Sequence, residues 1–173
     1  KHLDIRAKRF VPLVRKNAER FGLEPELLMA MIHTESYFNP MGVSHAGAMG
    51  LMQVIPRHAG REAYRYLYGN DWVIRPEYLY APGINIELGS AYLYLLRTQH
   101  FSTISNPTKK RYLCICGYNW GPTSVRKHIL DQYPVSTMST SALFSLLKKK
   151  TPRETSDYLV KVTNRVPIYS GYF

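Results

Sequence analysis

The chain has 173 residues, of which 45% are hydrophobic and 20% charged, which is typical of a folded domain and excludes a disordered or fibrous chain. This length fits one core, so we expect a single domain over residues 1–173. No apolar run reaches the roughly 18 residues of a membrane-spanning helix. The sequence starts at Lys1 without a secretory leader, which indicates a mature or trimmed soluble piece.

Charge is the unusual quantity, because 23 Lys and Arg against 12 Asp and Glu give a net charge of +11. Nucleic acid, anionic lipid and an acidic cell-wall polymer are all polyanions that a basic surface attracts. The basic residues are spread along the chain without the aromatic-interleaved pattern of RNA-binding segments. We therefore interpret them as solvated surface and expect no nucleic-acid partner.

The cysteine and histidine patterns are not those of a metal site. Cys114 and Cys116 lie two apart in a predicted helix, where their side chains diverge, so we expect free, buried thiols. The six His are scattered without ligand-like spacing. We expect neither a structural metal nor a cofactor.

Helical periodicity begins near the amino terminus. Apolar residues predict a helix over residues 4–21, which Pro12 starts or kinks and Gly22 closes. A second helix is predicted over residues 25–36, with Pro25 in its first position.

The middle of the chain is less regular. Weak helix signals lie at residues 51–54 and 58–67. Segment 68–82 has Gly, Asn, Asp and Pro residues and no helical period, so it is predicted to be a loop holding at most a short strand. Helical periodicity resumes over residues 84–96 and 109–120.

Two further helices are predicted towards the carboxyl terminus, over residues 123–130 and 151–166. The second begins at a capping box, in which Thr151 supplies the N-cap hydroxyl, Pro152 takes the first helical position and Glu154 completes the box. No stretch alternates apolar and polar residues long enough for a sheet. The fold class is therefore mainly α.

Glu35 stands at the carboxyl end of the apolar second helix. The helix macrodipole disfavours a carboxylate there, and apolar burial would raise the pKa further, which are the conditions for a general acid. The simpler interpretation is a solvated Glu on the polar face of its helix.

The surrounding motifs add information because they occur in a fixed order. They are Glu35-Ser36, Asn39-Pro40, Ser44, Gly50-Leu51-Met52-Gln53 (the glycine box, residues 50–53) and Gly117-Tyr118-Asn119. This set resembles the catalytic domain of the lytic murein transglycosylases. Asn85-Ile86 with Gly89, and Tyr158, resemble most the membrane-bound lytic murein transglycosylase C branch. The resemblance covers about residues 23–166.

The resemblance implies a lysozyme-like helical domain with a groove for peptidoglycan glycan strands. Members cleave the β-1,4 bond between N-acetylmuramic acid and N-acetylglucosamine without water, leaving a 1,6-anhydromuramic end and using no cofactor. Protonated Glu35 would donate to the glycosidic oxygen and then accept the proton of the attacking 6-hydroxyl. The 2-acetamido group of the substrate would replace the second carboxylate of ordinary glycosidases. Glu87, between Ile86 and Leu88, is expected on a solvated face.

The remaining matched residues are expected to bind substrate. By resemblance, Ser44 would bond the acetamido carbonyl, Gln53 the sugar hydroxyls, and Tyr118 would place its hydroxyl near Glu35. Each residue could instead have a purely structural role. Ser44 would then stabilise a turn, Gln53 would satisfy backbone groups and Tyr118 would pack in the core.

Three further matched residues are placed at the substrate with weaker arguments. Asn119 is expected to be structural rather than catalytic. Tyr158 would line a wall of the groove and Met52 its apolar floor, although a helical Met or Tyr most often packs in the core. Trp120 departs from the family pattern, which more often has a small residue there, and would narrow the groove. A Tyr-rich segment over residues 64–80 either shapes the substrate site or only packs a loop-rich lobe.

Two alternatives remain open. One is a goose-type lysozyme-like hydrolase, with Glu62 or Asp71 as its second carboxylate. The other is a non-catalytic glycan-binding module of a cell-wall assembly. The family implies a monomeric periplasmic enzyme of the bacterial cell envelope, whose parent protein is an outer-membrane lipoprotein and whose partners include cell-wall or secretion-machinery proteins.

Overall fold

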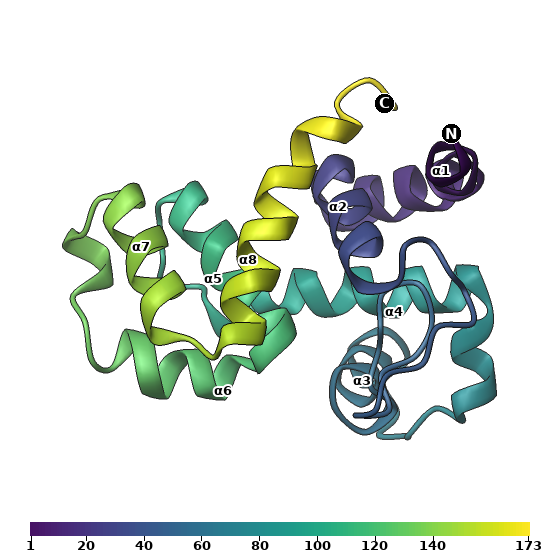
Figure 1. Ribbon diagram of the computed structural model, residues 1–173. Helices are drawn as coiled ribbons and strands as arrows, with labels where there is room; N and C mark the ends of the chain where they lie inside the picture. Colours follow the sequence, from purple (N-terminus) through teal and green to yellow (C-terminus); the bar gives the residue numbers. More distant parts are fainter. The chain divides into compact units, whose positions relative to one another are not determined.

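Every regular element of the computed structural model, which describes residues 1–173, is a helix (Figure 1). The α-helices are α1 (His2–Phe21), α2 (Pro25–Ser36), α3 (Arg61–Tyr68), α4 (Pro82–Leu95), α5 (Pro107–Trp120), α6 (Pro122–Val125), α7 (Thr140–Lys150) and α8 (Arg153–Arg165). The chain divides into two units: the first comprises residues 1–94 and 164–173, and the second residues 95–163. The predicted mainly α class is confirmed, and no helix is both long and apolar enough to cross a membrane.

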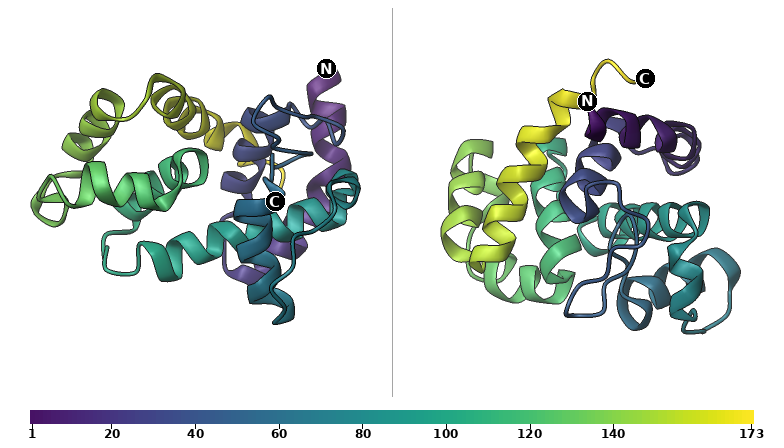
Figure 2. Two further views of the ribbon diagram at one scale, coloured as in Figure 1. Left: turned by 90° about the horizontal axis from the view of Figure 1, so that it is seen from below. Right: turned by 45° about the vertical axis from the view of Figure 1, so that its right-hand side comes forward.

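In the first unit, α1 packs on α2, and α2 packs on the 3-10 turn Val166–Tyr169 (Figures 1 and 2). α1 buries the face that its periodicity predicted, and Gly22 closes it in the left-handed conformation at φ 62°. The helix runs through Pro12 and does not start there. α2 is buried along most of its length, which explains why its sequence is apolar on every side.

The segment that follows α2 contains the glycine box and turns back on itself. Isolated bridges join Met49 to Val43 and to Val54. The helix predicted over residues 51–54 is wrong, because Gly50 has φ 75° and Gln53 has φ 49°, conformations that an α-helix excludes.

Asn85 on α4 anchors this turn from inside the core, where its side chain is fully buried. Its Oδ1 accepts a hydrogen bond from the Met52 backbone at 2.8 Å. Its Nδ2 donates to the carbonyl oxygens of Met49 at 2.8 Å and Leu79 at 2.9 Å. One side chain therefore satisfies three buried backbone groups, two in the turn of the glycine box and one in the 3-10 helix Pro76–Tyr80.

Along the chain, three short helical segments connect the glycine box to α4. A π-helical turn over Pro56–Gly60 leads into α3. Residues 69–75 are irregular and the 3-10 helix Pro76–Tyr80 follows, so the short strand allowed over residues 68–82 is absent.

The second unit is built around α5, which packs on α6 and α7. Cys114 and Cys116 are free and buried as predicted, and burial raises the pKa of each thiol to about 12. Sequence analysis missed α7, whose N-cap is Ser139, with the hydroxyl accepting from the Ala142 backbone at 3.1 Å. The predicted capping role of Thr151 is wrong, because α8 begins at Arg153 and Pro152, not Thr151, directly precedes it. The Thr151 hydroxyl instead donates back to the Leu147 carbonyl of α7 at 2.7 Å.

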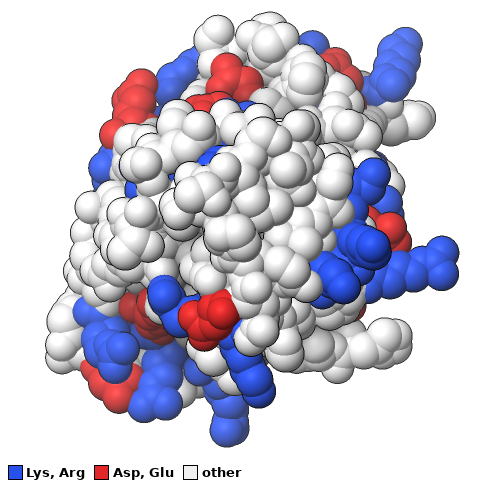
Figure 3. Space-filling view, turned by 90° about the vertical axis from the view of Figure 1, so that its left-hand side faces the viewer, with Lys and Arg blue, Asp and Glu red and all other residues white.

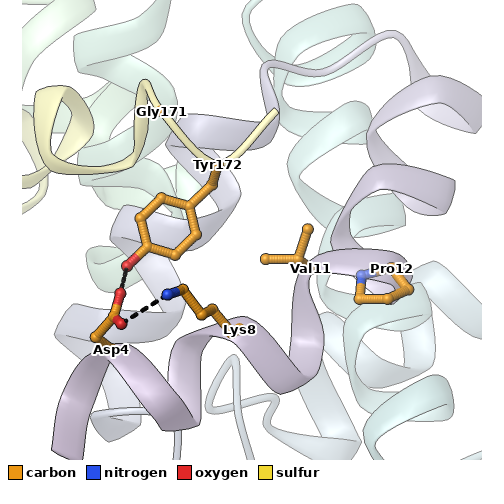
Figure 4. Close-up of a pocket in the computed structure, with 6 residues that line it drawn as sticks. All are labelled: Asp4, Lys8, Val11, Pro12, Gly171 and Tyr172. Atoms are coloured by element: carbon orange, nitrogen blue, oxygen red, sulfur yellow. Dashed lines mark hydrogen bonds and ion pairs between the residues drawn. The ribbon is translucent and has the colours of Figure 1, made fainter. Parts of the chain in front are cut away.

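The two ends of the chain meet in the first unit (Figure 4). The Tyr172 hydroxyl donates to the Asp4 carboxylate, which also pairs with Lys8 at 2.9 Å. Val11, Pro12 and Gly171 complete a shallow pocket of about 480 Å³ here.

Basic side chains occur in several separate groups on the face drawn in Figure 3. Acidic side chains lie among them, and a broad area between the groups carries neither kind. This distribution agrees with the interpretation of the basic runs as solvated surface.

The anchoring of the glycine box predicts different effects of alanine at two glycines with positive φ. A Cβ at Gly50 (φ +75°) would lie 2.3 Å from Asn85 Nδ2 and 2.4 Å from the Leu79 carbonyl oxygen, whereas at Gly47 (φ +81°) nothing lies within 4 Å. Gly47→Ala should lower the free energy of unfolding by about 1 kcal/mol and Gly50→Ala by about 3 kcal/mol or more, measured by urea unfolding. Equal losses would contradict the packing described for Gly50.

Candidate active site

Glu35 lies in the last turn of α2 and is half-buried. The helix ends directly after Ser36, because Tyr37 takes the left-handed conformation at φ 52°. The Ser36 hydroxyl contacts the Ile32 carbonyl of its own helix at 3.2 Å and the Leu51 carbonyl of the glycine box at 2.8 Å. The Glu-Ser pair thus ties the turn that carries Glu35 to the glycine box, although the two segments are separate in sequence.

Arg165, which sequence analysis missed, contacts residues that flank Glu35 in sequence. Its guanidinium donates to the Thr34 hydroxyl at 3.1 Å and to the Tyr37 hydroxyl at 3.2 Å, and it stacks over the Tyr37 ring at 5.3 Å. A cation therefore lies beside residues on both sides of Glu35 in sequence. No local signal pointed to it, because Arg165 comes from a segment more than a hundred residues away.

His33 fixes the same helical turn from the core. It is buried, and its Nδ1 lies 2.9 Å from the Tyr169 hydroxyl. Burial and, to a lesser degree, the charge of Arg165 lower the pKa of His33 to about 4. The imidazole is therefore neutral near pH 7.

Ser44 and Gln53 already make hydrogen bonds to the backbone. The exposed Ser44 hydroxyl accepts a hydrogen bond from the Ala48 backbone at 3.1 Å. This bond is the turn-stabilising role considered for Ser44 as an alternative to substrate binding. Gln53 Nε2 donates to the carbonyls of Gly42 and Gly50, both at 3.0 Å. These bonds leave the Ser44 hydroxyl hydrogen and the Gln53 carbonyl oxygen as the groups through which each residue could bind a ligand.

Met52 lies in the core, and its side chain is fully buried. A Cβ on Gly89 of α4 would come within 2.6 Å of the Met52 sulfur, so the two residues are in close contact. This explains why a glycine stands in the middle of α4. The Met52 side chain therefore anchors the glycine box to α4 in the core.

The other matched residues lie in the second unit, at the end of α5 and on α8. Asn119 Oδ1 accepts from the Thr155 hydroxyl at 2.8 Å, and its Nδ2 lies 3.5 Å from the Glu154 carboxylate. These contacts join α5 to α8 and agree with a structural role for Asn119. Tyr158 is buried on α8 and Tyr118 is half-buried on α5.

Trp120, the residue that departs from the family pattern, follows Asn119 at the end of α5. It is half-buried and stacks on His128, with ring centroids 5.3 Å apart and an interplanar angle of 20°. Part of the large Trp120 ring therefore packs against the π-helical turn Arg126–Leu130, which follows α6.

Two carboxylates considered at the sequence level are held by arginines. Asp71 accepts from Arg61 at 2.6 and 2.7 Å, a bidentate pair that lowers the pKa of the carboxyl. Glu87 pairs with Arg20 at 2.9 Å and accepts from the Tyr68 hydroxyl. Glu87 is therefore partly exposed, as a solvated face predicts, but α4 turns its carboxylate towards α1 and α3.

Comparisons with known proteins agree with this arrangement. The structure resembles lytic transglycosylase Slt from Pseudomonas aeruginosa, solved as an inactive Glu-to-Gln mutant, with a TM-score of 0.74 and 27% identity over 93% of this chain and 24% of that one. The 70 kDa soluble lytic transglycosylase of Escherichia coli gives a TM-score of 0.74 and 25% identity over the same shares. The fold is therefore the lysozyme-like helical fold of lytic transglycosylases, as predicted.

The sequence comparisons specify the family. The transglycosylase SLT domain model matches residues 12–138, and the chain belongs to this family. Membrane-bound lytic murein transglycosylase C of Actinobacillus pleuropneumoniae is 41% identical over 94% of this chain, and that of Haemophilus influenzae is 36% identical over 93%. The chain spans about half the length of these relatives, 46% in each case.

The buried His33 predicts how stability depends on pH. Because its pKa is about 4 in the folded chain and 6.5 ordinarily, the unfolded chain binds the proton first as the pH falls below 6.5. Between pH 7 and pH 5 the free energy of unfolding should therefore fall by about 2 kcal/mol through this group. Urea unfolding at both pH values measures it, and His33→Gln should flatten the dependence. An unchanged slope in that variant would assign the effect elsewhere.

Proposed function

We propose that this chain is the catalytic domain of a peptidoglycan lytic transglycosylase. The observation that carries the proposal is the hydrogen bond from Ser36 to Leu51, which holds the Glu35 turn against the glycine box. The SLT family match and the similarity to lytic transglycosylases over 93% of the chain support the same activity. That residues 1–173 act as one catalytic domain remains a prediction.

In this proposal Glu35 is the catalytic residue. Its protonated carboxyl donates to the glycosidic oxygen as the bond from the N-acetylmuramic residue to N-acetylglucosamine breaks. The substrate's acetamido oxygen stabilises the anomeric carbon as the leaving group departs. The Glu35 carboxylate then accepts the proton of the 6-hydroxyl, which closes on that carbon to give the 1,6-anhydro product without water.

The other site residues are proposed to bind the glycan. Ser44 would donate to the acetamido carbonyl and Gln53 would accept from a sugar hydroxyl. Tyr118, Asn119 and Tyr158 are proposed to bind substrate because of their resemblance to the family motifs. Asn119 also joins α5 to α8. Met52 would contribute by supporting the glycine box from the core.

A hydrolase of the goose-type lysozyme sort is the second candidate, and the structure weakens it at Asp71. A second carboxylate that activates water needs its charge, and Arg61 already compensates the charge of Asp71 through two hydrogen bonds.

The names of the relatives suggest where the protein works. We propose a monomeric enzyme of the bacterial cell envelope that acts in the periplasm, with a parent lipoprotein anchored to the outer membrane. Cell-wall or secretion-machinery proteins are the partners this location would provide. The basic net charge of +11 suits a wall polymer whose stem peptides carry carboxylates, and binding should weaken as salt rises.

The decisive test replaces the proposed acid. Glu35→Gln keeps the shape of the side chain but has no proton to donate, so the rate of glycan cleavage should fall by at least about 100-fold. Mass spectrometry of digested peptidoglycan strands measures both the rate and the ends, and the ends made by the unaltered chain should be 1,6-anhydromuramic.

The matched control is Glu26→Gln, the same change in the first turn of the same helix, which should retain activity. Full activity of Glu35→Gln would remove Glu35 as the acid. Reducing muramic ends would identify a hydrolase, and binding without cleavage by the unaltered chain would identify a glycan-binding module.

A further inference from the structure

An aromatic pocket of about 240 Å³ lies in the first unit among α3, the irregular segment after it and α4. Its aromatic lining is Tyr64, Tyr68, Trp72 and Tyr78, and Glu87 supplies its charged group. None of the residues matched to the family's motifs for Glu35, Ser44 or the glycine box lines it. We call it the aromatic pocket below.

The aromatic side chains present both packed and open faces. Tyr64 packs between Tyr68 and Trp72, with centroid distances of 4.8 and 5.0 Å. Trp72 and Tyr78 are nevertheless 39% and 38% exposed, and Tyr68 is 50% exposed. Exposed rings grouped around one cavity leave apolar surface in water that a ligand would cover.

One wall of the pocket is polar but has no net charge. The Glu87 carboxylate accepts from Arg20 at 2.9 Å and from the Tyr68 hydroxyl, so each oxygen has one protein donor. Hydrogen bonding to Glu87 and burial raise the pKa of Tyr68 to about 12, so its hydroxyl keeps its proton near neutral pH. Each carboxylate oxygen retains a lone pair for a further donor.

The pocket lies on a different side of α4 from the glycine box. Asn85 and Gly89 face that box, through the hydrogen bond to Met52 and the contact with the Met52 side chain. Ile84, Glu87 and Leu88 line the pocket instead, and each is rotated by about 100° or more on the helix from its neighbour among the two box-facing residues. The aromatic pocket is therefore a separate surface from the candidate active site.

We propose that the aromatic pocket is a second carbohydrate site, which binds one neutral N-acetylhexosamine ring of a glycan strand. This inference rests on the proposed function for the identity of the polymer. The volume lies below the roughly 300–1,000 Å³ of sites for drug-sized ligands, which suits one ring and not an oligosaccharide. Aromatic faces contact the C–H faces of the sugar, and Glu87 accepts from its hydroxyls.

The paired charges and the small size of the aromatic pocket determine which sugar it binds and how tightly. The charges at the pocket occur in pairs, Arg20 with Glu87 at 2.9 Å, and Arg75, which lies over the Tyr78 ring, with Glu77 at 3.6 Å. The pocket therefore has no unpaired charge that would attract an ionised ring. Contacts to one sugar ring give about millimolar affinity. On a wall polymer, where glycan is locally dense, this second contact increases retention by raising the effective concentration at the active site.

The test measures retention on purified peptidoglycan sacculi in the Glu35→Gln background, so that cleavage does not change the support. Adding Trp72→Ala should reduce the retained fraction by about tenfold, because one of the two contacts is removed. The matched control is Phe173→Ala, which deletes an aromatic ring of similar exposure, 37%, outside the pocket. A soluble chitin oligosaccharide should compete with retention of the control and have little effect on Trp72→Ala.

A second variant guards against misfolding, and thermal unfolding checks each protein. Tyr78→Ala removes a ring contributed by the 3-10 helix and should give the same loss if Trp72→Ala does not fold. With Glu35 restored, Trp72→Ala should cleave short soluble strands at the unaltered rate but digest sacculi more slowly. Unchanged retention in a folded pocket variant overturns the second site and leaves the proposed function intact. Absence of 1,6-anhydro products from the unaltered chain overturns the proposed function. The second site is judged separately, because loss of retention in Trp72→Ala supports it whichever products form.

Discussion

The side-chain amide of Asn85 is the interaction on which the described site depends. It is fully buried and bonds the backbone of Met49, Met52 and Leu79 at distances of 2.8 to 2.9 Å. A buried backbone group without a partner costs about 1–3 kcal/mol, so no aliphatic residue of similar size could replace this amide. Asn85 converts a glycine-rich turn with positive φ angles into a fixed part of the core.

A short series of contacts carries this rigidity to Glu35. α4 holds the glycine box through Asn85, and the Leu51 carbonyl of the box accepts from Ser36 at 2.8 Å. Ser36 is the last residue of α2, so the helical turn that contains Glu35 is held at its end. Arg165 holds the same turn through Thr34. The proposed proton shuttle would require this kind of fixed geometry, because the same carboxyl would meet two different oxygens in one turnover.

Apolar residues predicted the main helices, and tertiary contacts explain the errors. α1 has the spacing of one buried face, whereas α2 is apolar on every side and was predicted from its apolar residues and from Pro25 in its first position. α7 was missed because it ends in three lysines and begins with Ser and Thr, so its capping residue Ser139 was not recognised. Thr151 has the sequence of an N-cap, but α8 begins one residue later than that cap requires, and the Thr151 hydroxyl donates to a carbonyl of the preceding helix.

The sequence predicted a candidate set of site residues but not the contacts between them. The order of the motifs grouped Glu35 with the glycine box, whereas the use of Ser36 as the link between the two segments depends on a contact across 15 positions. Arg165 and the partners of Glu87 lie still further away in sequence. Such long-range pairs leave no periodicity to detect.

The residues of the glycine box and its surroundings divide their hydrogen-bonding capacity between the fold and a ligand. Gln53 commits its amide nitrogen to two backbone carbonyls, and Ser44 commits a lone pair to the Ala48 backbone. Their structural roles and their proposed binding roles are therefore compatible. A side chain already fixed by such bonds loses little conformational entropy when a sugar binds, so its remaining polar group contributes more of its interaction energy to affinity. Motif residues that look merely structural in the free protein are for this reason well suited to hold a substrate.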